Sequence, residues 1–296
     1  MTPASYPSQP VTFVSAAPPG GGWYQLCEHT IRVIQGERLA PVDVKMEQRK
    51  GAVELFEEMA TKRVGDANTI VAFSPGMTIQ LLNAKSKYTY KDVTPIGATS
   101  TDYGVLVVRA DSQIRELGDL LKLLKKAPQP VGGGQPVGFM HDAIVRTVTT
   151  AAGLDKSSFQ YMGSKNPAEA IASLTAGNVV VSAMGAANVT DELRSGKVRV
   201  LAVLSEKRIP GDFKNIPTAI EQGCKATFPM WRGFYGAKGM PDEARAFWEN
   251  TFTRLAGTKT WAKTLDDLGW FPFLLAGKRF ADFLERDTAQ YKSPSG

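Results

Sequence analysis

The stretch SAAPPGGGWYQL, residues 15–26, has the composition of a loop that brings its backbone close to another group. Three adjacent glycines, Gly20, Gly21 and Gly22, cost backbone entropy, so the loop needs a positive φ or a close approach to a phosphate, a carboxylate or a packed neighbour. A helix-like run begins at Trp23, and free N–H groups at a helix N-terminus favour anions. The loop therefore predicts anion binding through the backbone, with an ordinary tight turn as the alternative.

Four tracts contain no charged side chain, and each joins a short β-branched run to a turn rich in Gly, Pro or Asn. They cover residues 2–27, 67–84, 127–140 and 170–190. Hydroxyl groups that could donate to an anion occur in or beside these turns, at Ser74, Thr78 and Ser164. The four tracts together predict a neutral site that holds an anion by backbone and hydroxyl donors.

Enzyme chemistry finds little support in the sequence. The GGGWYQLC segment lacks the Lys and Ser/Thr of a P-loop, and no G-x-S-x-G elbow is present. The chain has 2 histidines, His29 and His141, and Cys27 and His29 fall on different helix faces. A lone histidine beside a turn, such as His141, is more often a hydrogen-bonded structural residue. We therefore predict no catalysis, no cofactor and no metal.

Composition sets further bounds on function. The 296 residues are 43% hydrophobic and carry a net charge of +6, which tolerates anionic ligands. The basic residues are scattered rather than gathered in a stripe, which argues against nucleic acid. No apolar segment reaches 18 residues, so a membrane span is not expected. Cys27 and Cys224 could form one disulfide, be two buried thiols, or be one of each kind.

The elements that must position these residues alternate between strand and helix. This alternation predicts an α/β fold with mostly parallel sheets, whose ligands bind beyond the carboxyl ends of the strands. Asn166 followed by Pro167 and Glu169 gives the clearest helix start. The acidic run Glu54 to Glu58 is interpreted as a solvated helix face. The predicted strands are Val11–Val14, Thr69–Phe73, Phe159–Met162, Val179–Met184 and Val198–Leu204; the predicted helices are Trp23–Gly36, Met77–Leu82, His141–Gly153, Pro167–Ala176 and Val189–Arg194.

Two further stretches look like strands that cross between two halves of the chain, at Tyr103–Arg109 and Arg232–Ala237. The chain after Pro241 has aromatic residues at helical spacing and is interpreted as helices that return to the first half. The predicted domains are therefore residues 1–104 with 229–296, and residues 105–228. Core packing is the default interpretation for each aromatic residue beside the loops, Trp23, Phe139 and Trp231, and Trp23 is expected to be the most exposed of the three.

Several segments in the right order carry a resemblance that covers nearly the whole chain: YPSQPVTFVSAAPPGGGW, DYGVLVVRADSQIRELGDLLKLLK, YMGSKNPAEAIASLTAGNV, GKVRVLAVLSEKRIPGDFKNIPTAIEQG and WRGFYGAKGMPDEARAFW. The sequence resembles the solute-binding proteins of the tripartite tricarboxylate transporter family, also called Bug or TctC-like proteins. The resemblance implies a type II periplasmic binding protein, with two α/β domains joined by two crossing strands and a ligand cleft between them.

The resemblance also implies a function and its partners. A receptor of this kind captures a small organic carboxylate, such as a citrate-like di- or tricarboxylate, and delivers it to membrane permease subunits, acting as a monomer in the periplasm. An export signal is expected ahead of Ala4. The implied ligand contacts are Ala17, Pro19, Gly20, Gly21, Gly22 and Trp23, then Ser74, Pro75 and Thr78, and, from the second domain, Gly138, Phe139, His141, Gly163, Ser164, Ala186 and Ala187.

Two departures from the family leave the ligand open. Many relatives carry an acidic residue in the segment matched by VSAMGAA, residues 181–187, and some have Asp where Tyr24 stands. An aromatic carboxylate is therefore an alternative ligand. An α/β hydrolase or transferase and the effector domain of a transcription regulator are the alternative classes. For the glycine loop we expect Gly21→Val to abolish binding without unfolding the protein, and Lys165→Ala to matter less.

Overall fold

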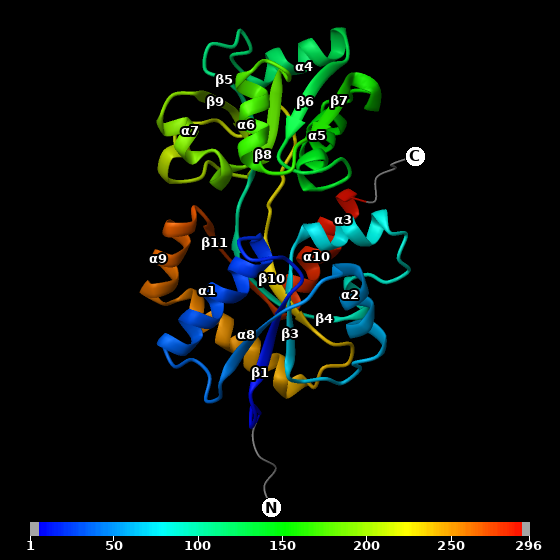
Figure 1. Ribbon diagram of the computed structural model, residues 1–296, viewed down its shortest axis with the longest axis vertical. Helices are drawn as coiled ribbons and strands as arrows, with labels where there is room; N and C mark the ends of the chain where they lie inside the picture. The colour runs from blue at the N-terminus through cyan, green and yellow to red at the C-terminus, as the bar shows by residue number, and fades with distance from the viewer. Residues whose placement is uncertain (1–5, 292–296) are drawn as a thin grey trace, which may run out of the picture. The chain divides into compact units, whose positions relative to one another are not determined.

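The computed structural model describes residues 6–291, and the chain divides into two compact units (Figure 1). One unit combines the chain up to Thr101 with the chain from Trp231 onward, and the other is Asp102–Met230. The expected export signal ahead of Ala4 concerns residues outside the described ones.

The first unit is built on a six-stranded sheet with the order β11-β4-β10-β3-β1-β2. Its strands are β1 (Val11–Ser15), β2 (Val44–Gln48), β3 (Thr69–Phe73), β4 (Thr94–Thr101), β10 (Arg232–Gly236) and β11 (Phe271–Ala276). Its helices are α1 (Gly22–Gly36), α2 (Ala52–Thr61), α3 (Pro75–Asn83), the 3-10 turn η1 (Tyr90–Asp92), α8 (Asp242–Ala256), α9 (Lys259–Leu268) and α10 (Gly277–Tyr291).

Aromatic side chains fill both faces of this sheet. On one face Phe13 packs against Phe234 of β10 and against Trp248 and Phe252 of α8, with ring centroids 5.0–6.4 Å apart within the group. On the other face Phe73 packs against Trp231, Tyr235 and Phe56, and Trp231 in turn contacts Phe280 of α10. The central strands β1, β3 and β10 are therefore fixed from both sides by core packing.

The second unit has a five-stranded sheet with the order β7-β6-β8-β5-β9. Its strands are β5 (Gly104–Arg109), β6 (Gln129–Gly133), β7 (Phe159–Gly163), β8 (Val181–Gly185) and β9 (Val198–Val203). Its helices are α4 (Leu117–Lys126), α5 (Met140–Ala151), α6 (Pro167–Thr175) and α7 (Thr190–Arg194), with 3-10 turns η2 (Lys156–Ser158), η3 (Ala186–Asn188) and η4 (Gly211–Phe213).

The sheets mix parallel and antiparallel pairs, so the expectation of mostly parallel sheets is wrong. Strand β1 runs parallel to β2 and β3, and β6 runs parallel to β7 and β8. Every antiparallel pair includes β4, β5 or β10, the strands next to the points where the chain passes from one unit to the other. Parallel neighbours in a sheet are usually joined by a crossover helix. A strand that arrives from the other unit is not joined to its neighbours in this way, so it can pair antiparallel.

The locally encoded elements agree well with the sequence. The strand over Thr69–Phe73 is confirmed, and Asn166 caps α6 by accepting from the Glu169 N–H at 2.9 Å. Helix α3 begins at Pro75 rather than Met77, because Ser74 is its N-cap and proline fits the first helical position. The strands β2, β4 and β11 were not predicted, and no bounds were predicted for β6, which lies in the charge-free tract 127–140. In β6, glycines replace the β-branched residues that mark a strand.

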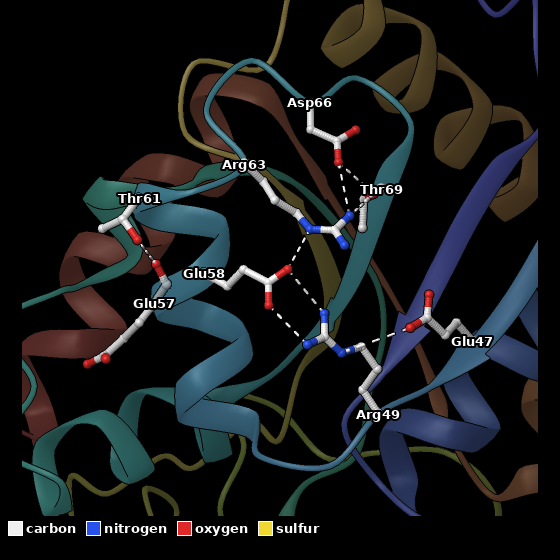
Figure 2. Close-up of polar contacts among 8 residues, drawn as sticks. All are labelled: Glu47, Arg49, Glu57, Glu58, Thr61, Arg63, Asp66 and Thr69. Atoms are coloured by element: carbon white, nitrogen blue, oxygen red, sulfur yellow. Dashed lines mark hydrogen bonds and ion pairs between the residues drawn. The ribbon is translucent and has the colours of Figure 1, made fainter.

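Glu58 corrects the interpretation of residues 54–58 as a solvated face. Its carboxylate accepts from both Nη atoms of Arg49, at 3.2 and 2.9 Å, and from Nε of Arg63 at 2.6 Å (Figure 2). Arg63 also donates to Asp66 and Thr69. Hydrogen bonds from Arg49 and then from Arg63 lower the pKa of Glu58 to about 2. The network joins α2 to the ends of β2 and β3.

The cysteines are both buried free thiols, one in each unit, which decides among the alternatives left by the sequence. Within residues 6–291, no helix has the length and apolar character needed to cross a membrane. The same residues hold no group of three His, Cys, Asp or Glu side chains suited to a metal ion.

Candidate functional site

The glycine loop before α1 uses two of its glycines for its own conformation. Gly20 has φ +81°, a region that side chains rarely adopt. A Cβ on Gly21 would lie 2.9 Å from the Ala17 Cβ and 3.0 Å from the Pro18 carbonyl oxygen, to which the Gly21 N–H donates at 2.9 Å. Gly21→Val would therefore distort the loop itself, so that variant cannot separate binding from loop structure as expected.

The first turn of α1 presents backbone donors without a capping side chain. Gly21 is the N-cap, with an extended backbone at φ −71° and ψ 154°, and it has no side chain to accept from the amides that follow. The N–H groups of Gly22, Trp23 and Tyr24 belong to the turn that lacks intrahelical acceptors. No acidic side chain lies in this turn. Its partial positive charge is thus available to an external anion.

Trp23 and Ser74 connect this turn to the next strand. The Trp23 Nε1 donates to Ser74 Oγ at 2.8 Å, and the Gly76 N–H donates to the same oxygen at 3.2 Å. Trp23 is only 8% exposed, so the expectation that it is the most exposed of the loop aromatics is wrong. As the second residue of α1, Trp23 packs its indole against the buried Ser74.

The sheet explains why Trp23 and Ser74 meet. Strands β1 and β3 are parallel neighbours, with Val14 paired to Val71, so the loops that follow them leave the same edge (Figure 1). In the loop after β1, the Ala17 N–H donates a hydrogen bond to the Ser15 hydroxyl at 3.1 Å, and Pro19 is exposed.

The remaining first-unit candidates, Pro75 and Thr78, are largely covered. Pro75 is buried at the first position of α3. Thr78 is also buried and lines a cavity of about 40 Å³ together with Tyr90 and Thr288, one turn beyond Ser74. The structure therefore places Ser74, but not the Thr78 hydroxyl, beside the N-terminus of α1.

In the second unit, His141 holds the turn after β6. It is 2% exposed, and its Nδ1 accepts from the Gly134 N–H at 3.0 Å. Burial lowers its pKa to about 4, so the ring is neutral near pH 7 and carries its proton on Nε2. This is the structural role that a lone histidine beside a turn predicts.

Asp142, which no sequence motif singles out, organises the same turn. Its buried carboxylate accepts from the Gly138 N–H at 2.8 Å and pairs with Arg146 Nε at 3.0 Å. Phe139 is the half-buried N-cap of α5 and offers no side-chain acceptor. The i, i+4 spacing of Asp142 and Arg146 on a predicted helix is the signal that could have found this pair.

The turn after β7 packs closely on the turn after β6. Ser164 donates its N–H to the Gly133 carbonyl at 2.8 Å. A Cβ on Gly163 would lie 2.6 Å from the Gln135 carbonyl oxygen, so only glycine permits this approach. The structure thus brings Gly163 and Ser164 together with the loop that carries Gly138 and His141.

The N–H groups of the last two candidates are already engaged. Ala186 is fully buried and donates to the Tyr103 carbonyl at 2.9 Å. Ala187 donates to both carboxylate oxygens of Asp102 at 3.4 Å. Asp102, which no sequence motif singles out either, is buried, and its carboxylate fills the space that a Cβ on Gly185 would need. It supplies an acidic group to a segment that lacks one in its own sequence.

Two α/β units, each with its own sheet and with the chain passing between them twice, are typical of solute-binding receptors. The family model for the tripartite tricarboxylate transporter family receptor, TctC, matches residues 37–293. The chain belongs to this family. It is a periplasmic solute-binding protein of the TctC/Bug type and not an enzyme.

Two curated relatives match most of the chain. A UPF0065 protein from the tcbD-tcbE intergenic region of Pseudomonas sp. strain P51 is 25% identical over 245 residues, which are 80% of this chain and 70% of that protein. BugT of Bordetella pertussis is 25% identical over 224 residues, 74% of this chain and 67% of that protein.

Solved structures show the same fold. A TctC solute binding protein from Polaromonas superposes with a TM-score of 0.85 at 24% identity, covering 97% of this chain and 98% of its own. MatC from Rhodopseudomonas palustris, solved with bound malate, gives a TM-score of 0.72 at 17% identity and covers 97% and 99%. An R. palustris protein solved with adipate gives 0.75 at 20% identity and covers 97% and 96%. The predicted type II periplasmic binding protein fold is confirmed.

Proposed function

We propose that this receptor captures a small aliphatic di- or tricarboxylate and delivers it to the membrane subunits of a tripartite tricarboxylate transporter, acting as a monomer. The observation that carries the proposal is the N-terminus of α1, where the first-turn amides have no capping side chain and no acidic neighbour in their turn. One ligand carboxylate would accept from the Gly22, Trp23 and Tyr24 amides, next to the Ser74 hydroxyl.

Comparison with structural relatives supports this choice of ligand. MatC was solved with bound malate, and the other R. palustris protein was solved with adipate. Malate and adipate are both aliphatic dicarboxylates. The net charge of +6 also favours an anionic solute. In the second unit, the turns that contain Gly138 and Gly163 offer a separate set of candidate contacts, held by the Gly138 N–H to Asp142 and by close packing at Gly163.

A ligand screen tests the proposal directly. The purified protein is heated with C4 to C6 dicarboxylates, citrate, aromatic carboxylates and the corresponding amides, and each hit is titrated by calorimetry. A ligand at 100 times its Kd adds about 2.7 kcal/mol of stability, which gives a clear rise in Tm. Stabilisation by aromatic acids alone would replace the aliphatic class by the alternative one, and stabilisation by none of the carboxylates would contradict the proposal.

The role of the backbone is tested at Gly22. Proline is tolerated at the first helical position and follows an extended residue well, and Gly21 is extended, so Gly22→Pro removes one N–H without breaking the helix. Gly22→Ala is the control for added bulk, because a Cβ there would lie 3.2 Å from Arg232 Nη1. Gly36→Ala, at the other end of α1 in open space, is the control for helix stability.

We expect Gly22→Pro to bind the best ligand of the screen about tenfold more weakly than Gly22→Ala, since a hydrogen bond to a charged group contributes about 1.5–3 kcal/mol. Gly36→Ala should bind like the unmodified protein. Calorimetric titration of the three variants gives the comparison. Equal affinity in Gly22→Pro and Gly22→Ala would show that the Gly22 amide does not contact the ligand.

A further inference from the structure

Arg232 lies at the edge of the first-unit sheet that carries the glycine loop. In the ladder between β10 and β3, Gly233 pairs with Phe73, so Arg232 comes next to the position of Ser74, just after the end of β3. Its side chain lies on the same face as Phe234, opposite the face on which Trp231 packs against Phe73. Because side chains alternate between the two faces along β10, the positively charged Arg232 side chain points toward α1.

The guanidinium of Arg232 is held between an aromatic ring and the glycine loop. Its central carbon lies 4.2 Å from the centroid of the Trp270 ring, and its Nη1 lies 3.2 Å from the place where a Cβ on Gly22 would stand. Stacking on Trp270 reduces the number of rotamers that the long side chain can adopt. The glycine at position 22 leaves room for this approach.

Two positive features therefore converge beside Gly22: the fixed charge of Arg232 and the partial positive charge of the α1 N-terminus. The two positive charges repel one another, but an anion that contacts both the Arg232 guanidinium and the α1 N-terminus is stabilised by both. A guanidinium also presents a planar fork of donors that matches a carboxylate better than an ammonium does.

We propose that Arg232 is a specificity-determining residue that contacts the ligand carboxylate bound at the N-terminus of α1. This inference rests on the proposed function, since it names the side chain that reads the negative charge of that ligand. Backbone N–H groups can donate to neutral as well as anionic oxygens, whereas the full positive charge of Arg232 makes the site require an anion. Trp270 is a positioning residue that holds the guanidinium in place.

The test compares Arg232→Gln, Arg232→Lys, Trp270→Leu and a charge-matched control. Arg245→Gln removes the same charge from an exposed residue of α8 that pairs with Asp242 and Glu249. Each variant is titrated by calorimetry with the carboxylate that binds the unmodified protein best, at 20 and 300 mM NaCl. Thermal melts without ligand verify that each variant is folded.

We expect Arg232→Gln to lose at least tenfold in affinity and to show a weaker dependence on salt, because the ion pair with the ligand is gone. Arg232→Lys should recover part of the affinity and the salt dependence, and Trp270→Leu should give an intermediate loss. Arg245→Gln should stay within twofold. A merely structural role for Arg232 would lower Tm without changing the salt dependence.

Three results overturn the inference. Affinity within twofold in Arg232→Gln would remove Arg232 from the site while leaving the proposed function intact. An equal loss in Arg245→Gln would show that net charge, not position, matters. Failure of the unmodified protein to bind any carboxylate would reject the proposed function and this inference together.

Discussion

At the scale of single residues, Asp287 on α10 is a buried carboxyl group whose charge costs stability. It is 5% exposed and accepts from Trp231 Nε1 at 2.9 Å and from Gln290 Nε2 at 2.8 Å. Burial raises its pKa from 3.8 to about 7, and the hydrogen bonds only partly oppose this rise. Because the folded pKa is the higher one, the contribution of Asp287 to stability is largest below pH 3.8 and is lost as pH rises through 7.

Between about pH 4 and pH 7, the free energy of unfolding of the unmodified protein should therefore fall as Asp287 ionises. We predict that Asp287→Asn does not show this fall. Denaturant unfolding at several pH values measures the difference between the two proteins. Asp282→Asn, on the exposed side of the same helix and paired with Lys278, is the control. A difference between Asp287→Asn and the unmodified protein that stays constant over this range would contradict the prediction.

Glu58 gives the opposite pH dependence. Its pKa is lowered to about 2 by hydrogen bonds from Arg49 and Arg63, so its stabilising contribution is complete above pH 4.5 and is lost as pH falls toward 2. We expect Glu58→Gln to lower the free energy of unfolding by about 1 kcal/mol at pH 7, an amount that shrinks between pH 4.5 and 2.

Denaturant titrations at pH 7 and pH 3 measure the effect of Glu58→Gln. Glu57→Gln is the neighbouring control, because the Glu57 carboxylate accepts from the Ser86 hydroxyl rather than from an arginine. If both variants lost the same stability at both pH values, the network of Figure 2 would not be a source of stability.

At the scale of elements, α6 depends on its N-cap. The Asn166 side chain accepts from the Glu169 N–H at 2.9 Å, and Glu169 accepts in return from the Lys165 N–H at 3.1 Å. We predict that Asn166→Ala lowers the free energy of unfolding by about 1 kcal/mol, while Asn166→Asp, which keeps an acceptor, changes it by a few tenths. Urea midpoints of the two variants measure this, and equal midpoints would show that the cap contributes nothing.

At the scale of the whole molecule, the two thiols report on the two units. Cys27 lies in the first unit and Cys224 in the second, and burial raises the pKa of each. We predict that neither reacts with a thiol reagent in the native protein and that both react after denaturation, without prior reduction. Mass spectrometry after alkylation counts the modified residues. Reaction of one thiol in the native state would show that its unit opens under native conditions.

The candidate site was only partly predictable from the sequence. The glycine loop and Ser74 could be selected because their signals are local: glycines beside a helix start, and a hydroxyl followed by proline at a cap. Asp102 and Arg232 could not, since their roles depend on Gly185 and Gly22, which are distant in sequence. No periodicity or motif encodes such a pair.

Local sequence by itself determined the strand at Thr69–Phe73, the cap at Asn166 and the turn at Gly20, because neighbouring residues fix backbone conformation through sterics and short-range hydrogen bonds. Tertiary structure alone decided which strands run antiparallel, that Trp23 turns inward to Ser74, and that Arg232 lies against the loop that begins α1. Those outcomes depend on which strands become neighbours in a sheet, and that choice is made by burial of the whole aromatic core rather than by any one segment.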